Sequence, residues 1–313
     1  MTFHIIGDIH GHAEKLEALL RKLGYVQTRG TYRHPYATAI FVGDFIDRGP
    51  HQLETLNIVR RMVDMGSAQA VMGNHEFNAI AWHTPDPDAP GEYLRPHGGP
   101  KGTHNRYQHQ AFLTELQNQP ALHSDFVAWF KTLPLWLDLP GLRVVHACWH
   151  EAHMQTLRPL LSANHQLTDD ALLQASRANT PAFQAVETLL KGIEAPLPAG
   201  LYFLDKDGHK RHHVRLRWWL SEKKTYRDLG LMPDTAAQAK LPDAIIPADI
   251  LPPPTSDKPL FFGHYWFSNT PAPLSATLAC VDYSAGKQGP LVAYCWDGEP
   301  TLQTCRFITS TDN

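Results

Sequence analysis

The fold of this chain is decided by a stretch in which an apolar run leads directly into a polar loop, TAIFVGDFIDRGP (residues 38–50). The run that ends at Val42 is rich in β-branched and aromatic residues, which favours a strand. Residues 53–65 then place apolar side chains at the spacing of an amphipathic helix. This order predicts a strand, a loop and a helix.

The same order occurs on both sides of this stretch. Residues 2–6 are an apolar run before the loop GDIHG (residues 7–11), and residues 14–23 have helical spacing. Residues 68–72 lead into a third loop, GNHE (residues 73–76). Strands that alternate with helices imply right-handed βαβ units, which place the strand ends along one edge of a largely parallel sheet. We therefore expect the three polar loops to meet at the edge where open α/β sheets bind ligands.

Further apolar strands are predicted in the second half of the chain. Residues 142–145 and 259–263 are two of them, and each is followed by a histidine. Residues 276–307 alternate as two or three strands around a turn at residues 286–289, which predicts a hairpin that closes a second sheet.

The predicted organisation is one domain over residues 1–313 with two additions. Residues 151–258 are expected to form an inserted, mainly helical, cap-like region. Residues 82–125 are expected to form a surface loop and helical excursion, with helices over 111–122 and 125–133.

Composition excludes several classes of protein. The chain has 313 residues, of which 43% are hydrophobic and 10% aromatic, and no apolar run approaches the roughly 20 residues that span a bilayer. The first residues enter a strand at once, so no secretory leader is expected. The net charge of -3 gives no overall basic surface. The four widely spaced cysteines are expected to be reduced, which predicts a cytoplasmic protein without a membrane partner.

The polar loops carry residues suited to a pair of divalent ions. Asp8 and His10 lie two apart at a strand end, so both side chains can point toward one ion. Asp44 can bridge two ions and hold them at the roughly 3.5 to 4 Å separation of two-metal hydrolysis. The remaining ligands of the second ion are predicted to be Asn74, His146 and His264.

Other residues of the loops suit proton transfer and phosphate binding. His75 is predicted to be a general acid, oriented by Asp47. Arg48 is predicted to bind phosphate oxygens, because its planar guanidinium matches them bidentately. Arg217, in the basic segment before a tryptophan pair, and His12 are predicted to be further substrate-binding residues.

At these positions the chain resembles the calcineurin-like metallophosphoesterases. The forms GDxHG, GDxxDRGP and GNHE resemble the phosphoprotein-phosphatase branch, close to bacterial Ser/Thr phosphatases and diadenosine-tetraphosphatase-like proteins. The resemblance implies a four-layer αββα sandwich of two mixed β-sheets, with two divalent ions. Manganese is expected first, with iron, zinc or nickel as alternatives. The family's roles at matching positions agree with those given above.

The expected function is that of a metal-dependent phosphohydrolase, in which a bridging hydroxide attacks phosphomonoesters or nucleoside polyphosphates directly. One alternative is a protein Ser/Thr phosphatase. Another is a nucleic-acid end phosphatase or cyclic phosphodiesterase, although the charge does not favour nucleic acid. A non-enzymatic alternative is a module that binds phosphorylated ligands. The expected partner is a small phosphorylated substrate or a phosphoprotein.

Overall fold

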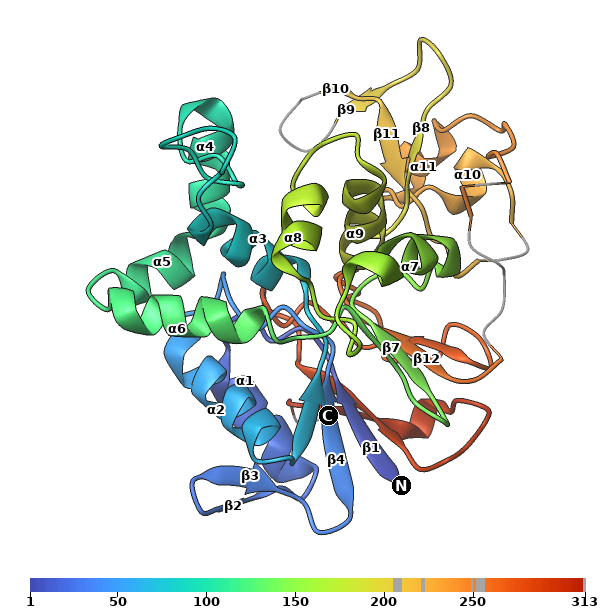
Figure 1. The fold of residues 1–313 in the computed structure, drawn as a ribbon. Coiled ribbons are helices and arrows are strands. Elements are labelled where there is room, and N and C mark those ends of the chain that lie inside the picture. Colours follow the sequence, from blue (N-terminus) through green and yellow to red (C-terminus); the bar gives the residue numbers. More distant parts are fainter. Residues whose placement is uncertain (205–209, 221–222, 249, 252–256, 312–313) are drawn as a thin grey trace.

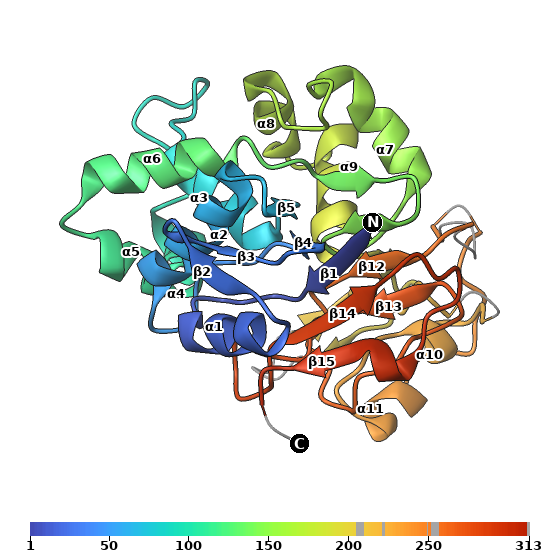
Figure 2. The same cartoon turned by 90° about the horizontal axis from the view of Figure 1, so that it is seen from below.

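Two β-sheets face each other at the centre of the protein (Figure 1, Figure 2). The computed structural model describes residues 1–204, 210–220, 223–248, 250–251 and 257–311. The first sheet has the order β15-β14-β1-β4-β5, and the second has the order β13-β12-β7-β6. The first consists of β1 (Thr2–Ile6), β4 (Ala37–Phe41), β5 (Ala68–Ala70), β14 (Val292–Trp296) and β15 (Phe307–Thr309). The second consists of β6 (Trp136–Asp138), β7 (Arg143–Val145), β12 (Leu260–Phe262) and β13 (Leu278–Cys280).

Both sheets are mixed, as the family resemblance implies. In the first, β1, β4 and β5 are parallel, whereas β14 is antiparallel to β1 and β15 to β14. In the second, β12 is parallel to β7 and β13, and β6 is antiparallel to β7. The parallel strands of each sheet therefore end at one edge, which is where the polar loops begin.

The βαβ units predicted from the N-terminal sequence are confirmed. Helix α1 (Ala13–Lys22) follows β1, and α2 (Gln52–Asp64) connects β4 to β5. The prediction missed a short hairpin between α1 and β4, formed by β2 (Val26–Thr28) and β3 (Thr31–Arg33). Each of its strands has only three residues, too few to show alternation.

The alternation of side chains along β1 separates two cores. Phe3 and Ile5 belong to the cluster between the sheets, together with Val144 and Phe261 of the second sheet. Ile6 points the other way and joins the larger cluster that includes α1 and α2. A period of two residues in a strand thus fixes which residues pack on the facing sheet and which on the helices.

Helices after His83 build a lobe beside the first sheet. Helix α3 (Asn74–His83) begins in the third polar loop, and α4 (Gly99–Gln108) follows an irregular segment. The predicted helices over 111–122 and 125–133 are instead α5 (Gln110–Leu116) and α6 (Pro120–Phe130). The boundary lies earlier than predicted because Pro120, which lacks an amide hydrogen, starts α6 at its first position.

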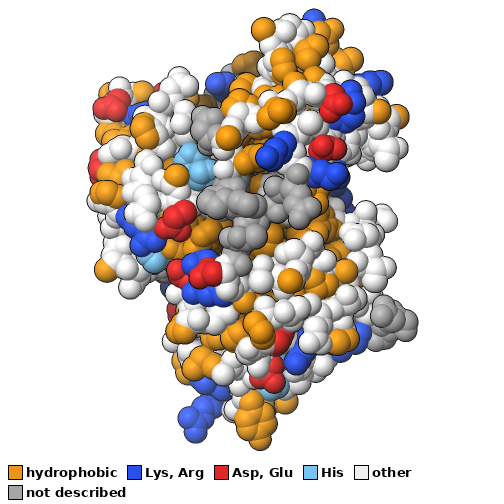
Figure 3. Space-filling model, turned by 90° about the vertical axis from the view of Figure 1, so that its right-hand side faces the viewer, with side chains coloured by type: hydrophobic (Ala, Val, Ile, Leu, Met, Phe, Trp, Pro, Cys, Tyr) orange, Lys and Arg blue, Asp and Glu red, His pale blue; other side chains and the backbone are white. Residues whose placement is uncertain are grey.

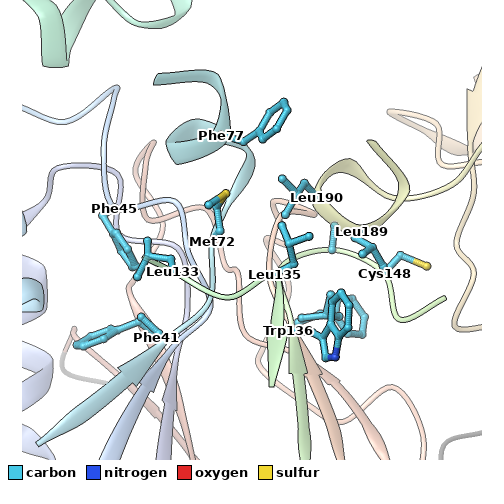
Figure 4. Packing of buried hydrophobic residues seen from close by; sticks show 14 of the residues in the cluster. Phe41, Phe45, Met72, Phe77, Leu133, Leu135, Trp136, Cys148, Leu189 and Leu190 are labelled. Atoms are coloured by element: carbon cyan, nitrogen blue, oxygen red, sulfur yellow. The ribbon is translucent and has the colours of Figure 1, made fainter. Parts of the chain in front are cut away.

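Residues 151–258 supply the outer layer of the second sheet as well as a lobe above it. Trp218 and Trp219 lie 4.9 and 5.6 Å from the ring of Phe262 on β12. Figure 4 shows Leu189 and Leu190 close to Leu135 and Cys148, again at this sheet. The elements of the region are α7 (Glu151–Leu157), η1 (Arg158–Leu160), α8 (Asp169–Ala175), α9 (Pro181–Lys191), β8 (Glu194–Pro196), β9 (Phe203–Leu204), β10 (Lys210–Arg211), β11 (His213–Arg215), α10 (Tyr226–Leu229) and α11 (Thr235–Ala239).

The hairpin predicted around residues 286–289 is wrong. The strands on its two sides lie in different sheets, since β13 pairs with β12 and β14 pairs with β1. β14 is almost entirely buried, which is expected of a strand inside a sheet with packed layers on both faces. A short 3-10 helix, η2 (Thr304–Arg306), then leads to β15.

Two expectations from composition can be compared with the described residues. None of their helices has the length and apolar character needed to cross a bilayer. All four cysteines are free, and two of them, Cys148 and Cys280, are buried.

A candidate dinuclear metal centre

The predicted metal-binding residues converge at the carboxyl edge of the two sheets. Asp8 and His10 follow β1, Asp44 follows β4, and Asn74 opens α3 after β5. His146 and His264 follow β7 and β12 of the other sheet. All six side chains are buried, although up to 256 residues separate them in sequence. The facing edges of the sheets therefore create one polar site inside an apolar core.

Asp44 is shared by two groups of possible metal ligands. One group is Asp44 with His10 and His75, and the other is Asp44 with His146 and His264. Asp44 Oδ2 lies 3.6 Å from His10 Nε2, and Asp44 Oδ1 lies 3.4 Å from His146 Nε2. The two oxygens of one carboxylate thus face two sides of the site, which fits a bridging ligand.

Several buried polar atoms in the site have no hydrogen-bond partner among the described residues. They include Asp8 Oδ1, His10 Nε2 and His264 Nδ1. The other oxygen of Asp8 accepts a hydrogen bond from the backbone amide of His264 at 3.0 Å. Buried polar atoms are normally satisfied, so unpartnered carboxylate and imidazole atoms around one point fit divalent ions.

The site also holds more buried negative charge than the sequence analysis assigned. Asp282 is buried, and burial raises its pKa to about 6. Burial, and then the charge of Asp282, raise the pKa of Asp8 well above its ordinary value. Bound cations would relieve this repulsion, so the charge balance agrees with the donor atoms. No short motif surrounds Asp282 that could have revealed it.

Glu76 organises the loops and was given no role by the sequence analysis. Its Oε2 accepts hydrogen bonds from the amides of Asp44 and Gly73, at 2.8 and 3.0 Å, and its Oε1 accepts one from Phe45 at 2.8 Å. Burial and the charge of Asp44 raise its pKa to about 7. Glu76 thereby ties the second loop to the third. Its place in the GNHE motif was the available signal.

The glycines of these loops allow backbones to approach closely. A Cβ atom on Gly73 would lie 2.3 Å from Asp44 Oδ1, and one on Gly263 would lie 2.0 Å from Asp8 Oδ1. Such contacts are too short for any Cβ atom. Glycine is therefore required at both positions for the carboxylates to occupy their places.

His75 and Asp47 form the predicted hydrogen-bonded pair. His75 Nδ1 lies 2.6 Å from Asp47 Oδ2, while His75 Nε2 faces the site, 4.0 Å from Asp44 Oδ2. Burial lowers the pKa of His75, but the charges of Asp44 and Asp47 outweigh it and the net shift is upward. The imidazole is thus held in one orientation with its other nitrogen turned inward.

A second histidine also holds Asp47. Nδ1 of His109 lies 2.9 and 3.1 Å from the two oxygens of this carboxylate, and its side chain is buried. No motif near His109 links it to a loop 62 residues away, so its contact with Asp47 was not predicted.

Arg48 lies exposed beside the buried cluster. Its guanidinium carbon is 4.5 Å from the centre of the Trp266 ring, and that ring stacks on His10 at 5.0 Å. The indole face attracts the cation and so directs Arg48 across the site. Arg48 is thus placed to contact a ligand held there.

Arg215, and not the predicted Arg217, is the arginine of the 151–258 region that reaches the cluster. Nη1 of Arg215 lies 3.2 Å from His264 Nε2. Nη2 of Arg217 instead donates to the carbonyl of Asp228 at 2.6 Å. The described polar partner of His12 is Glu14, at 3.2 Å, so the structure does not join His12 to the buried residues of the site.

Backbone strain is concentrated at the site. Non-glycine residues with positive φ include His10, Asp44 and His264, at 50°, 52° and 75°. Asp47, Arg48 and Trp266 also have positive φ, of 70°, 72° and 53°. Such conformations cost on the order of 1–3 kcal/mol each and persist only where surrounding contacts enforce them.

Comparison with known proteins agrees with this geometry. Residues 1–190 match the family model described as calcineurin-like phosphoesterase. A bis(5'-nucleosyl)-tetraphosphatase PrpE of Bacillus subtilis is 38% identical over 153 residues, 47% of this chain and 57% of that protein. The namesake from Oceanobacillus iheyensis is 32% identical over 148 residues, 47% of this chain and 55% of its own length. The chain thus spans little more than half of these relatives.

Two matches among solved structures are more distant. One is a protein serine/threonine phosphatase from Saccharomyces cerevisiae, with a TM-score of 0.49, 14% identity, and coverage of 99% of this chain and 78% of that one. Another is a metallophosphoesterase from Sphaerobacter thermophilus, with a TM-score of 0.41, 14% identity, and coverage of 99% and 87%. The family model covers more than half of the chain, and the protein therefore belongs to the calcineurin-like phosphoesterase family.

Proposed function

We propose that the protein is a metal-dependent phosphohydrolase that acts on nucleoside polyphosphates, and on small phosphomonoesters, through a dinuclear centre. The observation that carries this proposal is Asp44, whose two oxygens face two buried groups of metal ligands. The PrpE relatives, whose names describe nucleoside-tetraphosphate hydrolysis, support the substrate class.

The proposed ligands are divided between the two ions. Asp8, His10 and Asp44 would hold the first ion, and Asp44 is shared with the second. Asn74, His146 and His264 would complete the second, and Asn74 Oδ1 already lies 3.1 Å from His146 Nε2. Manganese is the proposed metal, with iron, zinc or nickel as alternatives, because carboxylate, amide and imidazole donors are mixed. The ions supply neutralisation of phosphate charge and acidification of water near pH 7.

The residues of the chain perform the remaining steps. Arg48 and Arg215 approach the site from two sides and hold the anionic oxygens of the substrate. His75 Nε2 donates a proton to the leaving oxygen, and Asp47 fixes the imidazole and stabilises its protonated form.

The proposed substrate is a small molecule and the proposed location is the cytoplasm. Free thiols agree with a reducing compartment. Figure 3 shows one face of the protein, on which basic and acidic side chains of the described residues are interspersed and do not form a continuous basic stripe. This face therefore does not favour the binding of long nucleic acids.

Turnover on a substrate panel tests the proposal. The panel contains para-nitrophenyl phosphate, its bis-ester, diadenosine tetraphosphate, a phosphopeptide and phosphorylated RNA ends, each with manganese and after chelation. We expect manganese-dependent, chelator-sensitive hydrolysis with a preference for the dinucleotide. Two bound ions per chain without turnover on any substrate would contradict the proposal and favour a phospho-ligand binding module.

A further inference from the structure

A cavity of about 1010 Å³ lies beside the candidate metal centre. It is bounded by α3, α4, α8 and α9 and by the segment between α3 and α4, and we call it the α3–α9 cavity. Figure 1 shows how these helices are arranged. Its volume is at the upper end of the range of small-molecule sites, roughly 300–1,000 Å³.

The two helical walls both lead to the metal centre. Phe77 and Ala81, one turn apart on α3, line the cavity, and the same helix begins with Asn74 of the centre. On the other wall, Phe183 and Lys191 lie on one face of α9. The end of α9 lies against the centre, because the amide of Ala147, the residue after His146, donates to Leu189. Figure 4 shows Phe77 and Leu190 on the two sides where these walls meet.

Arg95 connects the cavity with the centre. Its Nη2 donates to Gln108 at 2.7 Å, and its Nε is buried without a hydrogen-bond partner among the described residues. Burial lowers the pKa of Arg95, and the charges of Asp47 and of Glu187 on α9 partly oppose this shift, so Arg95 senses carboxylates of both the centre and the cavity wall. A desolvated arginine with an unused donor attracts phosphate strongly.

The charged residues of the lining have a net positive formal charge. Among the described residues it contains five Lys or Arg and three Asp or Glu, and Lys191 is paired with Glu187. Asp86 is neutralised by Arg177 through two hydrogen bonds of 2.6 and 2.5 Å. This pair connects the segment between α3 and α4 with the residues that follow α8. Lys101 is exposed to solvent. Aromatic side chains form part of the apolar surface of the cavity.

We propose that the α3–α9 cavity is the distal subsite of the enzyme, which binds the phosphates and nucleoside beyond the bond that is cleaved. This inference rests on the proposed function and makes it more specific. A polyphosphate chain places charge beyond the two ions, and Arg95, Lys101 and Lys191 meet that charge along the walls. Phe183 and Tyr93, which are only partly buried, offer ring faces on which a nucleobase can pack. A short monoester does not extend into the cavity, so the subsite determines specificity.

Charge-removing variants test this subsite. Arg95→Gln, Lys101→Met and Lys191→Met are each measured with manganese on diadenosine tetraphosphate and on para-nitrophenyl phosphate. Each variant should lower the ratio of the two kcat/KM values by about tenfold, the loss expected for one charge-assisted phosphate contact. Lys131→Met is the matched control, because Lys131 is half-buried like Lys191 but lines a different pocket. This substitution should change the ratio of the two kcat/KM values by less than about twofold.

Binding provides a second readout. In the His75→Ala background, which suppresses turnover, the same three variants should weaken the calorimetric affinity for diadenosine tetraphosphate by about tenfold. Lys101→Met keeps the test valid if the half-buried Arg95 variant does not fold, since Lys101 is exposed.

The outcomes separate this inference from the proposed function. If the wild type hydrolyses para-nitrophenyl phosphate and the variants lower kcat/KM equally for both substrates, the subsite is refuted but the proposed phosphohydrolase function stands. A preference for phosphopeptides that is lost in the same variants refutes the nucleotide assignment. Absence of activity on every substrate with manganese overturns both.

Discussion

Residues 1–150 and the 151–258 region hold their charged groups in different ways. In the first, the carboxylates of Asp44, Asp47 and Glu76 are buried and each receives a backbone or imidazole partner. In the second, described ion pairs such as Arg215–Glu194 and Arg227–Asp243 are largely exposed. Buried charges must be paired to persist, whereas exposed pairs contribute at most about 1 kcal/mol. The buried carboxylates of the first region therefore depend on their partners, whereas the exposed pairs of the second contribute little to stability.

The largest effect is expected from Asp44→Asn, which removes the shared carboxylate of both ligand groups. We expect turnover to become undetectable and metal content to fall, because an amide is a poor bridge between two cations. Metal analysis beside a kinetic assay measures both. Glu194→Gln is the control from the other region and should keep both ions. Two ions retained in Asp44→Asn would argue against the bridge.

The next effect is expected from His75→Ala. The variant should retain both ions and lose about two to four orders of magnitude in kcat, because it removes only the proposed proton donor. Substrates with poor leaving groups should show the full loss, and para-nitrophenyl phosphate a smaller one. An equal loss on all leaving groups would place His75 among the ligands instead, as its position near His10 and Asp44 also permits.

His109 offers a comparison within the same network. His109→Leu removes the second partner of Asp47 and should lower kcat by about 10- to 100-fold with KM little changed, the effect usual for a group that orients a catalytic residue. His109→Asn, whose amide can occupy the place of Nδ1, should recover much of this loss. If both variants lose kcat equally, packing of the buried ring and not the hydrogen bond is responsible.

Glu76→Gln tests whether the loops are held by a buried acceptor. The substitution turns an NH2 group toward backbone amides, which should lower the free energy of unfolding by about 1–3 kcal/mol. Denaturant unfolding of the chelated protein is the measurement. Glu187→Gln, which breaks a partly exposed pair with Lys191, should change the same free energy by less than about 1 kcal/mol.

The smallest effects concern acid stability. Burial, and then a neighbouring histidine, lower the pKa of His4 to about 4 in the first region and that of His153 to about 4 in the second. The unfolded chain binds more protons than the folded one between pH 6.5 and 4, so stability is full above pH 6.5 and falls as the pH drops through this window. His4→Gln and His153→Gln should each flatten the decline in Tm. An unchanged slope in either variant would mean that its imidazole is hydrated.

The parts of the fold that could be predicted from the sequence are those determined by local sequence patterns. The first two βα units, the third strand and the polar loops at the strand ends follow from the sequence pattern, and right-handed crossovers bring the loops together. His146 and His264 were identifiable because each follows an apolar strand. These features need no knowledge of distant contacts.

The β2–β3 hairpin was missed because its strands are short, but the other missed features depend on such distant contacts. His109 and Asp282 reach the site from segments without a motif, and their burial appears only when the sheets pack. The choice of Arg217 over Arg215 failed for a related reason. The two arginines are two residues apart, so they would lie on the same face of a continuous strand. β11 ends at Arg215, however, and strand alternation no longer determines where Arg217 points. The wrong hairpin shows the same limit, since adjacent strands can enter different sheets.

Trp266 gives the protein an internal optical reporter. Its indole stacks on His10, while the cations of Arg48 and Lys287 lie 4.5 and 4.6 Å from the ring. The fluorescence of an indole depends on the charges around it. The fluorescence of Trp266 should therefore change when a metal ion binds next to His10, and when Arg48 moves toward a substrate. The difference in emission between the wild type and Trp266→Phe therefore makes the loading of the active site visible without any added dye.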